Sequence, residues 1–252
     1  MTLEIDTALK RPNSIHGART MMFSELEKVM AYSLDTGLYL DAMGENVFGK
    51  KSSDGIKQTN GFLKRLYGFE LSNQNFVAFE YFWKICETNE RPFIAFIYAI
   101  NNDELLAESI DVLKKVNPGD KANIENFEEM IESNHPNKYS PKTRRSMAQN
   151  IASSWKQAGF IQGKVKNIRT EPIITYRVAC FAFLLAYLSG NRGEFIWNSI
   201  GVKALCLPES KLRDLALECA RKDFMQYQYA GSVTAISFTN LLNKIGINGN
   251  TN

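Results

Sequence analysis

Several residue types that carry particular chemistries are scarce in this chain of 252 residues. It has only two histidines, His16 and His135, and we expect both at the surface, which leaves little for metal binding or acid–base catalysis. The four cysteines form no C-x-x-C pair and lie in apolar helical contexts. They predict reduced core thiols of a cytoplasmic protein and suggest neither a zinc site nor a disulfide framework. The sequence predicts no cofactor.

Long apolar runs are lacking as well. The longest, Val178 to Leu188, is shorter than the roughly 20 residues that a membrane span needs, so it predicts a buried core helix. The first residues alternate between apolar and charged and do not form a cleavable signal pattern. Because 44% of the residues are apolar and 12% aromatic, the chain has enough material for a proper core and no expected contact with a membrane.

Acidic residues are absent from Ser133 to Thr170. The preceding segment, Asp103 to Glu132, has nine acids and three bases, and the whole chain has a net charge of only +3, so the imbalance is local. A local cationic surface favours a polyanion, because each neutralised phosphate releases counterions. The alternative is a solvated helix face that binds nothing. Eight basic residues make up this stretch: Lys138, Lys142, Arg144, Arg145, Lys156, Lys164, Lys166 and Arg169.

The same stretch predicts a helix followed by a hairpin. Ser140 is a natural N-cap, Pro141 suits the first helical position, and Gly159 favours the end of the helix. Helical periodicity gives this helix an apolar face (Met147, Ile151, Trp155, Ala158) and a basic face (Lys142, Arg145, Gln149, Ser153, Lys156). Beyond it, the segments Phe160–Ile161 and Val165–Ile168 flank Gln162-Gly163 and predict a short hairpin that carries Lys164, Lys166 and Arg169. Residues 140–170 therefore have the outline of a winged helix-turn-helix.

The whole chain is predicted to be mainly α, with helix-turn-helix or winged-helix-like units and one or two short β-hairpins. We expect a flexible N-terminal arm at 1–17 and a helix-turn-helix-like domain at 18–72, whose third helix carries Lys57, Lys64 and Arg65. A helical domain would follow at 73–252. It repeats the order of helix and hairpin at 208–240, where acids offset the bases and predict a packing or protein-contact role. Further helices are expected at about 18–34, 38–43, 54–67, 74–87, 93–100, 103–116, 124–131, 176–188 and 194–200, and a polar tail at 243–252.

Residues about 21 to 165 resemble the BrxA family, the small accessory protein of BREX bacteriophage-resistance systems. The similarity rests on Thr143-Arg144 through Ala158 with Phe160-Ile161 behind it, and on shorter echoes at Ser24-Glu25, Glu45-Asn46-Val47, Ser53, Lys57, Arg65-Leu66, Trp83-Lys84-Ile85-Cys86 and Phe93-Ile94. The resemblance implies a mostly helical protein that binds DNA within a multi-protein defence system. Its DNA-facing positions would be Lys57, Lys64, Arg65 and the Lys142–Lys156 face. The C-terminal 80 or so residues extend beyond the family's usual end.

The leading hypothesis is a non-enzymatic protein that binds double-stranded DNA. The 141–158 helix would lie against or in the major groove, with Arg145 and Gln149 at base edges and Lys164, Lys166 and Arg169 on the backbone. Since lysines dominate the basic face, we expect mainly phosphate contacts and weak sequence preference.

Two other hypotheses come from different functional classes. A nuclease is disfavoured, because the sequence shows no clustered metal motif, no nucleophile beside a histidine and no credible phosphate loop. An adaptor would bind partners, such as other phage-defence proteins, through the acidic 103–132 face and the C-terminal helix and hairpin, and its basic patch would dock a protein or RNA. The opposite charges of the two segments also permit self-association.

Overall fold

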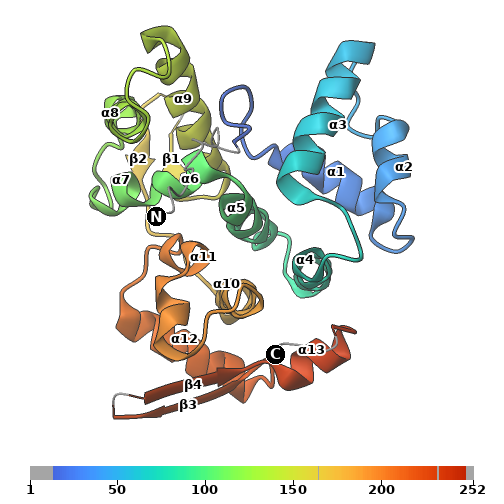
Figure 1. Cartoon of the computed structure of the whole chain (residues 1–252), viewed down its shortest axis with the longest axis vertical. Helices are drawn as coiled ribbons and strands as arrows, with labels where there is room; N and C mark the ends of the chain where they lie inside the picture. The colour runs from blue at the N-terminus through green and yellow to red at the C-terminus, as the bar shows by residue number, and fades with distance from the viewer. Residues whose placement is uncertain (1–13, 164, 232, 248–252) are drawn as a thin grey trace, which may run out of the picture.

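The computed structural model describes residues 14–163, 165–231 and 233–247, and it is mainly helical with two short antiparallel hairpins (Figure 1). The first half of the chain forms α1 Phe23–Ser33, α2 Tyr39–Gly44, α3 Ser53–Tyr67, α4 Gln74–Ile85, α5 Arg91–Asn102, α6 Glu104–Glu108, α7 Ile110–Lys114 and α8 Ile124–Asn134. The second half forms α9 Pro141–Gln157, β1 Ile161–Gln162, β2 Ile168–Arg169, α10 Tyr176–Leu188, the 3-10 helix η1 Gly193–Asn198, α11 Ile200–Lys203, α12 Glu209–Arg221, β3 Gln226–Ala230, β4 Val233–Ser237 and α13 Thr239–Lys244. The mainly α prediction is confirmed.

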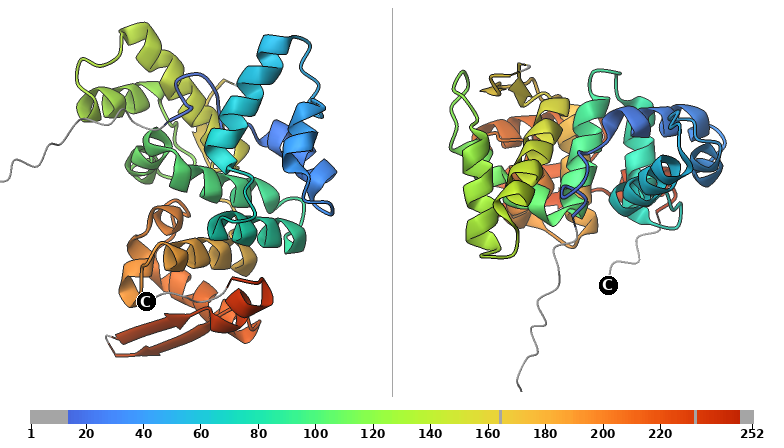
Figure 2. Two further views of the ribbon diagram at one scale, coloured as in Figure 1. Left: turned by 45° about the vertical axis from the view of Figure 1, so that its right-hand side comes forward. Right: turned by 90° about the horizontal axis from the view of Figure 1, so that it is seen from above.

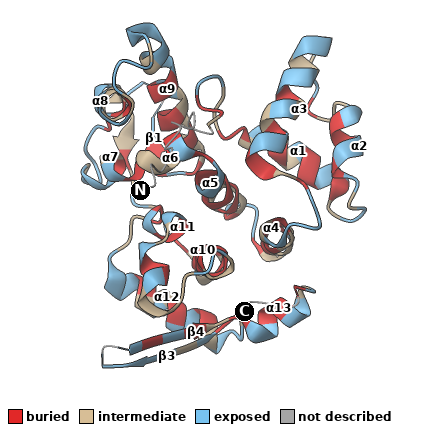
Figure 3. Ribbon diagram, in the orientation of Figure 1, coloured by how far each residue is buried: buried red, intermediate tan, exposed pale blue. Residues whose placement is uncertain are grey.

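The core runs through the middle of the molecule along α5 and α10 (Figure 3). Every residue of α10 from Val178 to Ala186 is buried, so the predicted core helix is confirmed there. It packs against α4, α11 and α12. One connected cluster of buried side chains extends from Ile15 to Ile247, across the boundary expected after residue 72. A division into two domains at that point stays a prediction.

The segment around α9 has the expected order of helix and hairpin. Gly159 follows the helix at φ +82°, a left-handed conformation that favours glycine. Strands β1 and β2 pair antiparallel, with Ile161 opposite Arg169, and Lys121 forms a bridge to Ile168 on the other side of β2. Backbone hydrogen bonds thus join residues 119–122, before α8, to residues 167–169 along the outer edge of this two-stranded sheet. The second strand begins at Ile168 and not at Val165 as predicted, because residues 165–167 are not in strand conformation.

Some local predictions were wrong. Residues 14–17 of the expected flexible arm are packed, with Ile15 and His16 buried, while residues 1–13 lie outside the described part. The expected 103–116 helix is divided at Ser109, and the 194–200 helix is η1 followed by α11. The expected polar tail begins inside α13, and residues 248–252 are not described. In the described part of the chain, none of the helices has the length and hydropathy that crossing a bilayer requires.

Candidate nucleic-acid interface

Helix α9 has the two faces that the sequence predicts. Its apolar stripe is buried, with Met147 at 2% and Trp155 at 0% exposure, and its outer stripe carries Lys142 and Gln149 exposed and Lys156 half-buried. Ser140 caps the first turn by accepting a hydrogen bond from the Thr143 N–H. Within the described residues, neither lysine has a carboxylate at ion-pair distance. Both are therefore available to an anionic partner.

The two arginines of α9 turn instead toward the acidic helix α8. Arg145 Nη1 lies 2.7 Å from Glu125 Oε1 and 2.6 Å from Glu128 Oε1, and Arg144 pairs with Glu132. The guanidinium of Arg145 holds the pKa of Glu125 below its usual range, which indicates a mutually stabilised charge pair. Base contacts by Arg145, predicted from its place on the helical wheel, would require this pair to open. The cationic surface is smaller than the formal charge of the segment suggests, because α8 neutralises part of it.

The predicted basic residues of the hairpin that the structure describes differ in exposure. Lys166 is exposed in the loop between β1 and β2, whereas Lys164 lies outside the described residues. Arg169 was predicted to reach the DNA backbone, and this is wrong: it is 5% exposed, and its Nη1 donates to the carbonyl oxygens of Phe160 and Thr170. The guanidinium also lies over the Phe160 ring. Arg169 therefore holds the hairpin against the end of α9.

Helix α3 carries a second basic surface. Ser52 caps it by accepting from the Gly55 N–H, and Lys57, Lys64 and Arg65 are all exposed on it. A hollow of about 460 Å³ lies on its outer face, lined by Asp54, Lys57, Gln58, Gly61, Phe62 and Arg65. The guanidinium of Arg19 lies 5.3 Å from the centre of the Phe62 ring and donates to Gln58 at 3.4 Å. Sequence reasoning missed Arg19, because its residue type alone does not show that the chain returns to α3.

Residues 14–23 join the two basic helices. On the α9 side, Met21 N donates to Ser154 Oγ at 2.8 Å and Phe23 N donates to Gln157 Oε1 at 3.1 Å. On the α3 side, Arg65 Nη2 donates to Ser14 O at 3.2 Å and the Tyr67 hydroxyl donates to Met21 O at 2.6 Å. Figures 1 and 2 show α3 and α9 at the same end of the molecule with this segment between them. The fold thus connects what the sequence presents as two separate basic helices.

His16 is the centre of this junction and is fully buried, so its expected surface location was wrong. Its Nδ1 lies 2.9 Å from Asp103 Oδ2, and its Nε2 lies 2.8 Å from Ser154 Oγ. Burial alone would raise the pKa of the Asp103 carboxyl, but His16 and the N–H of Leu106 outweigh it and keep that pKa below its usual range. Asp103 also accepts hydrogen bonds from Ser14 Oγ and Ile15 N at 2.8 Å each.

This order of carboxylate, imidazole and hydroxyl matches that of a serine-hydrolase triad, and the statement that no nucleophile lies beside a histidine was wrong. The environment indicates a structural role. Ser154 and His16 are both 0% exposed, and Ser154 Oγ already accepts from Met21 N and lies 3.1 Å from its acceptor Asn150 O. A substrate carbonyl has no approach to a hydroxyl in such a position. His135 is half-buried, with Nε2 3.0 Å from Glu108 Oε1, and is not the surface residue that we predicted.

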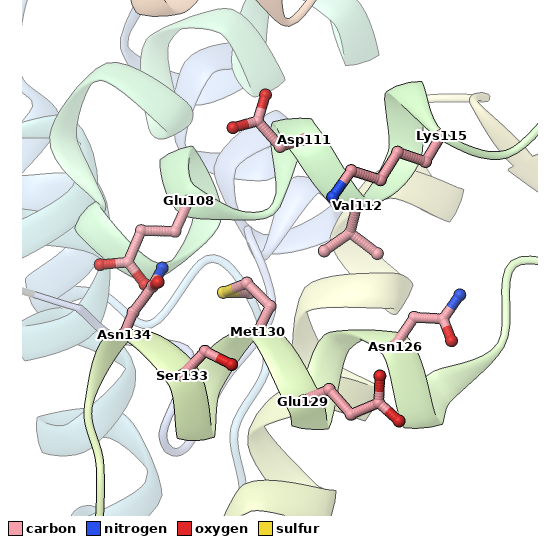
Figure 4. Close-up of a pocket in the computed structure, with 9 residues that line it drawn as sticks. All are labelled: Glu108, Asp111, Val112, Lys115, Asn126, Glu129, Met130, Ser133 and Asn134. Carbon is pink, nitrogen blue, oxygen red and sulfur yellow. The ribbon is translucent and has the colours of Figure 1, made fainter.

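A separate pocket of about 520 Å³ lies between α6, α7 and α8 (Figure 4). Its lining combines the apolar Val112 and Met130 with Glu108, Asp111, Glu129 and Lys115. Three carboxylates against one ammonium do not suit a phosphate or a nucleic acid. Among the residues that the structure describes, no three His, Cys, Asp or Glu side chains are grouped so that they could hold a metal ion.

A partner that binds this region would therefore contact the exposed lysines of α3, α9 and the hairpin loop. Their positive charge suits electrostatic contact with an extended anion. Comparison with protein-family models, curated proteins and solved structures finds no match to this chain.

Proposed function

We propose that this chain is a non-enzymatic DNA-binding accessory protein of a bacterial phage-defence system similar to BREX. One observation supports DNA binding above the others: residues 14–23 tie α3 to α9 at one end of the molecule, and the lysines of these two helices have no ion-pair partner among the described residues. The role in phage defence comes from the resemblance to the BrxA family.

In this proposal α9 acts as the recognition helix of a winged helix-turn-helix formed by α7, α8, α9 and the β1–β2 hairpin. The outer stripe of α9 faces the duplex, with Lys142 and Lys156 on phosphates and Gln149 the amide nearest to base edges. Lys166 in the hairpin loop and Lys57 and Lys64 on α3 add phosphate contacts. If these five lysines each neutralise one phosphate, the logarithm of the affinity falls with the logarithm of the salt concentration with a slope of about −4.5.

The test is a fluorescence-anisotropy titration of a labelled duplex at several salt concentrations. We expect the triple variant Lys57→Glu, Lys142→Glu, Lys156→Glu to bind at least ~100-fold more weakly, since three phosphate contacts become repulsive. Its melting temperature should stay unchanged, because all three side chains lie outside the core.

A matched control carries the same change of charge elsewhere. Lys203→Glu, Lys222→Glu and Lys244→Glu alter three exposed lysines of the C-terminal part. This control should bind DNA within a few-fold of the wild type. Equal loss in both triple variants would show that only net charge matters, and a salt slope near zero would rule out phosphate contacts altogether. A wild type that does not bind would leave the basic surface to a protein or RNA partner of an adaptor.

Removing the acids that neutralise Arg145 should strengthen binding. The double variant Glu125→Gln, Glu128→Gln releases the guanidinium and removes two negative charges beside α9. We expect affinity for the duplex to rise by roughly 3–10-fold at low salt, and the gain to shrink as salt screens the charges. Asp214→Asn, a loss of one exposed acid on α12, should change affinity little. An unchanged affinity in the double variant would show that α9 does not face the duplex.

A further inference from the structure

The β3–β4 hairpin has an edge that nothing in the described chain covers. The pairs run from Gln226 opposite Ser237 to Ala230 opposite Val233, so two sequence positions separate the strands. Hairpins with this spacing close on a hydrogen-bonded pair, so the alternation of an antiparallel ladder turns the N–H and C=O groups of Tyr227 and Tyr229 away from β4. Among the described residues no backbone group bonds to them on that side. Figure 1 shows β3 as the outermost strand, at the opposite end of the molecule from α3 and α9.

The other edge of the hairpin is covered. Strand β4 packs against η1, and Gly193 approaches so closely that a Cβ there would lie 2.9 Å from Thr234 O. The inner face is anchored by Arg213, whose Nη1 donates to Thr234 Oγ1 at 3.1 Å and to the Tyr227 hydroxyl at 3.3 Å. Its guanidinium also pairs with Glu194 and lies 4.1 Å from the centre of the Tyr229 ring. The open edge is therefore held in place by the body of the protein.

This edge lacks the usual protection against strand pairing. Natural edge strands carry lysine, proline or a bulge, but the segment from Gln226 to Ser237 contains no charged residue and no proline, and its pairing register has no bulge. The outward face is also exposed and uncharged, with Gln226, Gln228, Ala230, Val233 and Ala235 in solvent. In a chain in which 23% of the residues are charged, such a surface indicates a contact that charge would disturb.

We propose that β3 pairs with β3 of a second copy of this chain, antiparallel about a two-fold axis at Gln228, to form a continuous four-stranded sheet. This register places Tyr227 opposite Tyr229 of the other copy twice, so all four outward-facing backbone groups of each strand find a partner in four hydrogen bonds. It also forms two cross-strand tyrosine pairs, which stabilise antiparallel sheets. The two-fold axis sets Gln228 directly opposite its own copy, and because this residue is uncharged, no like charges face each other there.

The proposed interface is small, and its two-fold symmetry limits the assembly to a dimer. Two five-residue strands bury less than the ~1,200 Å² of a standard interface, so we expect a dissociation constant on the order of tens of micromolar. Both α3–α9 surfaces remain free in the dimer, since the hairpin lies at the far end of the molecule. If the proposed DNA binding holds, two surfaces on one dimer raise the apparent affinity for long duplexes by avidity. The dimer itself does not depend on DNA.

The experiment is sedimentation equilibrium of the full chain without DNA, from about 1 to about 300 µM. We expect the wild type to move from the monomer mass toward twice that mass, with no weakening at high salt. Gln228→Lys and Gln228→Glu each place like charges a few ångströms apart across the axis, and each should weaken association at least ~10-fold. An equimolar mixture of the two variants should associate again as a heterodimer, which a misfolded hairpin would not do.

A control places the same charge on the other strand. Ala235→Lys changes the exposed residue opposite Gln228 on β4, where the two copies of the charge are separated by more than a Debye length. It should associate within a few-fold of the wild type. A wild type that stays monomeric at every concentration, a Gln228→Lys variant that associates as the wild type does, or a mixture that stays monomeric would each overturn the proposal. If the wild type stays monomeric, the open edge of β3 would be available to a strand of another protein instead.

Discussion

Replacing Asp103 by alanine should lower the free energy of unfolding by about 3–5 kcal/mol at neutral pH. The carboxylate is 2% exposed and receives hydrogen bonds from Ser14, Ile15 and the N–H of Leu106 as the cap of α6, besides its contact with His16. Its loss leaves a buried imidazole and several buried donors without an acceptor. Urea denaturation followed by circular dichroism measures the difference.

The pH dependence of this difference has a definite sign. The pKa of Asp103 is lowered by folding, so its contribution is complete above the unfolded value of about 3.9 and is lost as the pH falls through the lower folded value. The difference in the free energy of unfolding between the wild type and Asp103→Ala should therefore shrink below about pH 4. Asp111→Ala, which removes an exposed acid of α7, should stay within ~0.5 kcal/mol of the wild type. If Asp103→Ala lowered the free energy of unfolding by an equally small amount, residues 14–17 would not be held by Asp103 as the structure shows.

Replacing Trp155 by alanine should also cost about 3–5 kcal/mol. The side chain is 0% exposed and lies between the rings of Phe96 and Phe160, with centroid distances of 4.5 and 5.2 Å. Its Nε1 donates to Ser109 Oγ at 2.7 Å, at the break between α6 and α7. Truncation therefore creates a cavity where α9, α5 and the β1–β2 hairpin meet.

The neighbouring residue supplies the control for this prediction. Lys156→Ala removes a half-buried side chain without an ion-pair partner among the described residues, and its unfolding free energy should change by less than ~0.5 kcal/mol. Thermal melts of the two variants at one protein concentration compare them directly. If Trp155→Ala had the same melting temperature as the wild type, this ring would not anchor α9 to the core. The orientation of the basic face of α9 would then need revision.

Much of the local structure of this protein is predictable from its sequence. Ser140, Pro141 and Gly159 mark the ends of α9, and the spacing of Met147 and Trp155 fixes which of its faces is buried. The apolar composition of α10 and the turn at Gly231 in the second hairpin were predictable for the same reason. Caps, turns and amphipathic stripes depend on residues a few positions apart, which one segment contains in full.

Which side chains of the candidate site are free to bind depends on how distant segments pack together. Arg145 looks like a free cation in the sequence and is paired with Glu125 and Glu128, while Arg169 is buried under the end of α9. His16 meets Asp103 and Ser154, which lie far from it and from each other along the chain. Charge neutralisation and burial depend on which helices pack together, and packing is set by the sum of many distant contacts. A local pattern therefore predicts that a side chain is charged, but only the fold decides whether that charge is free to bind.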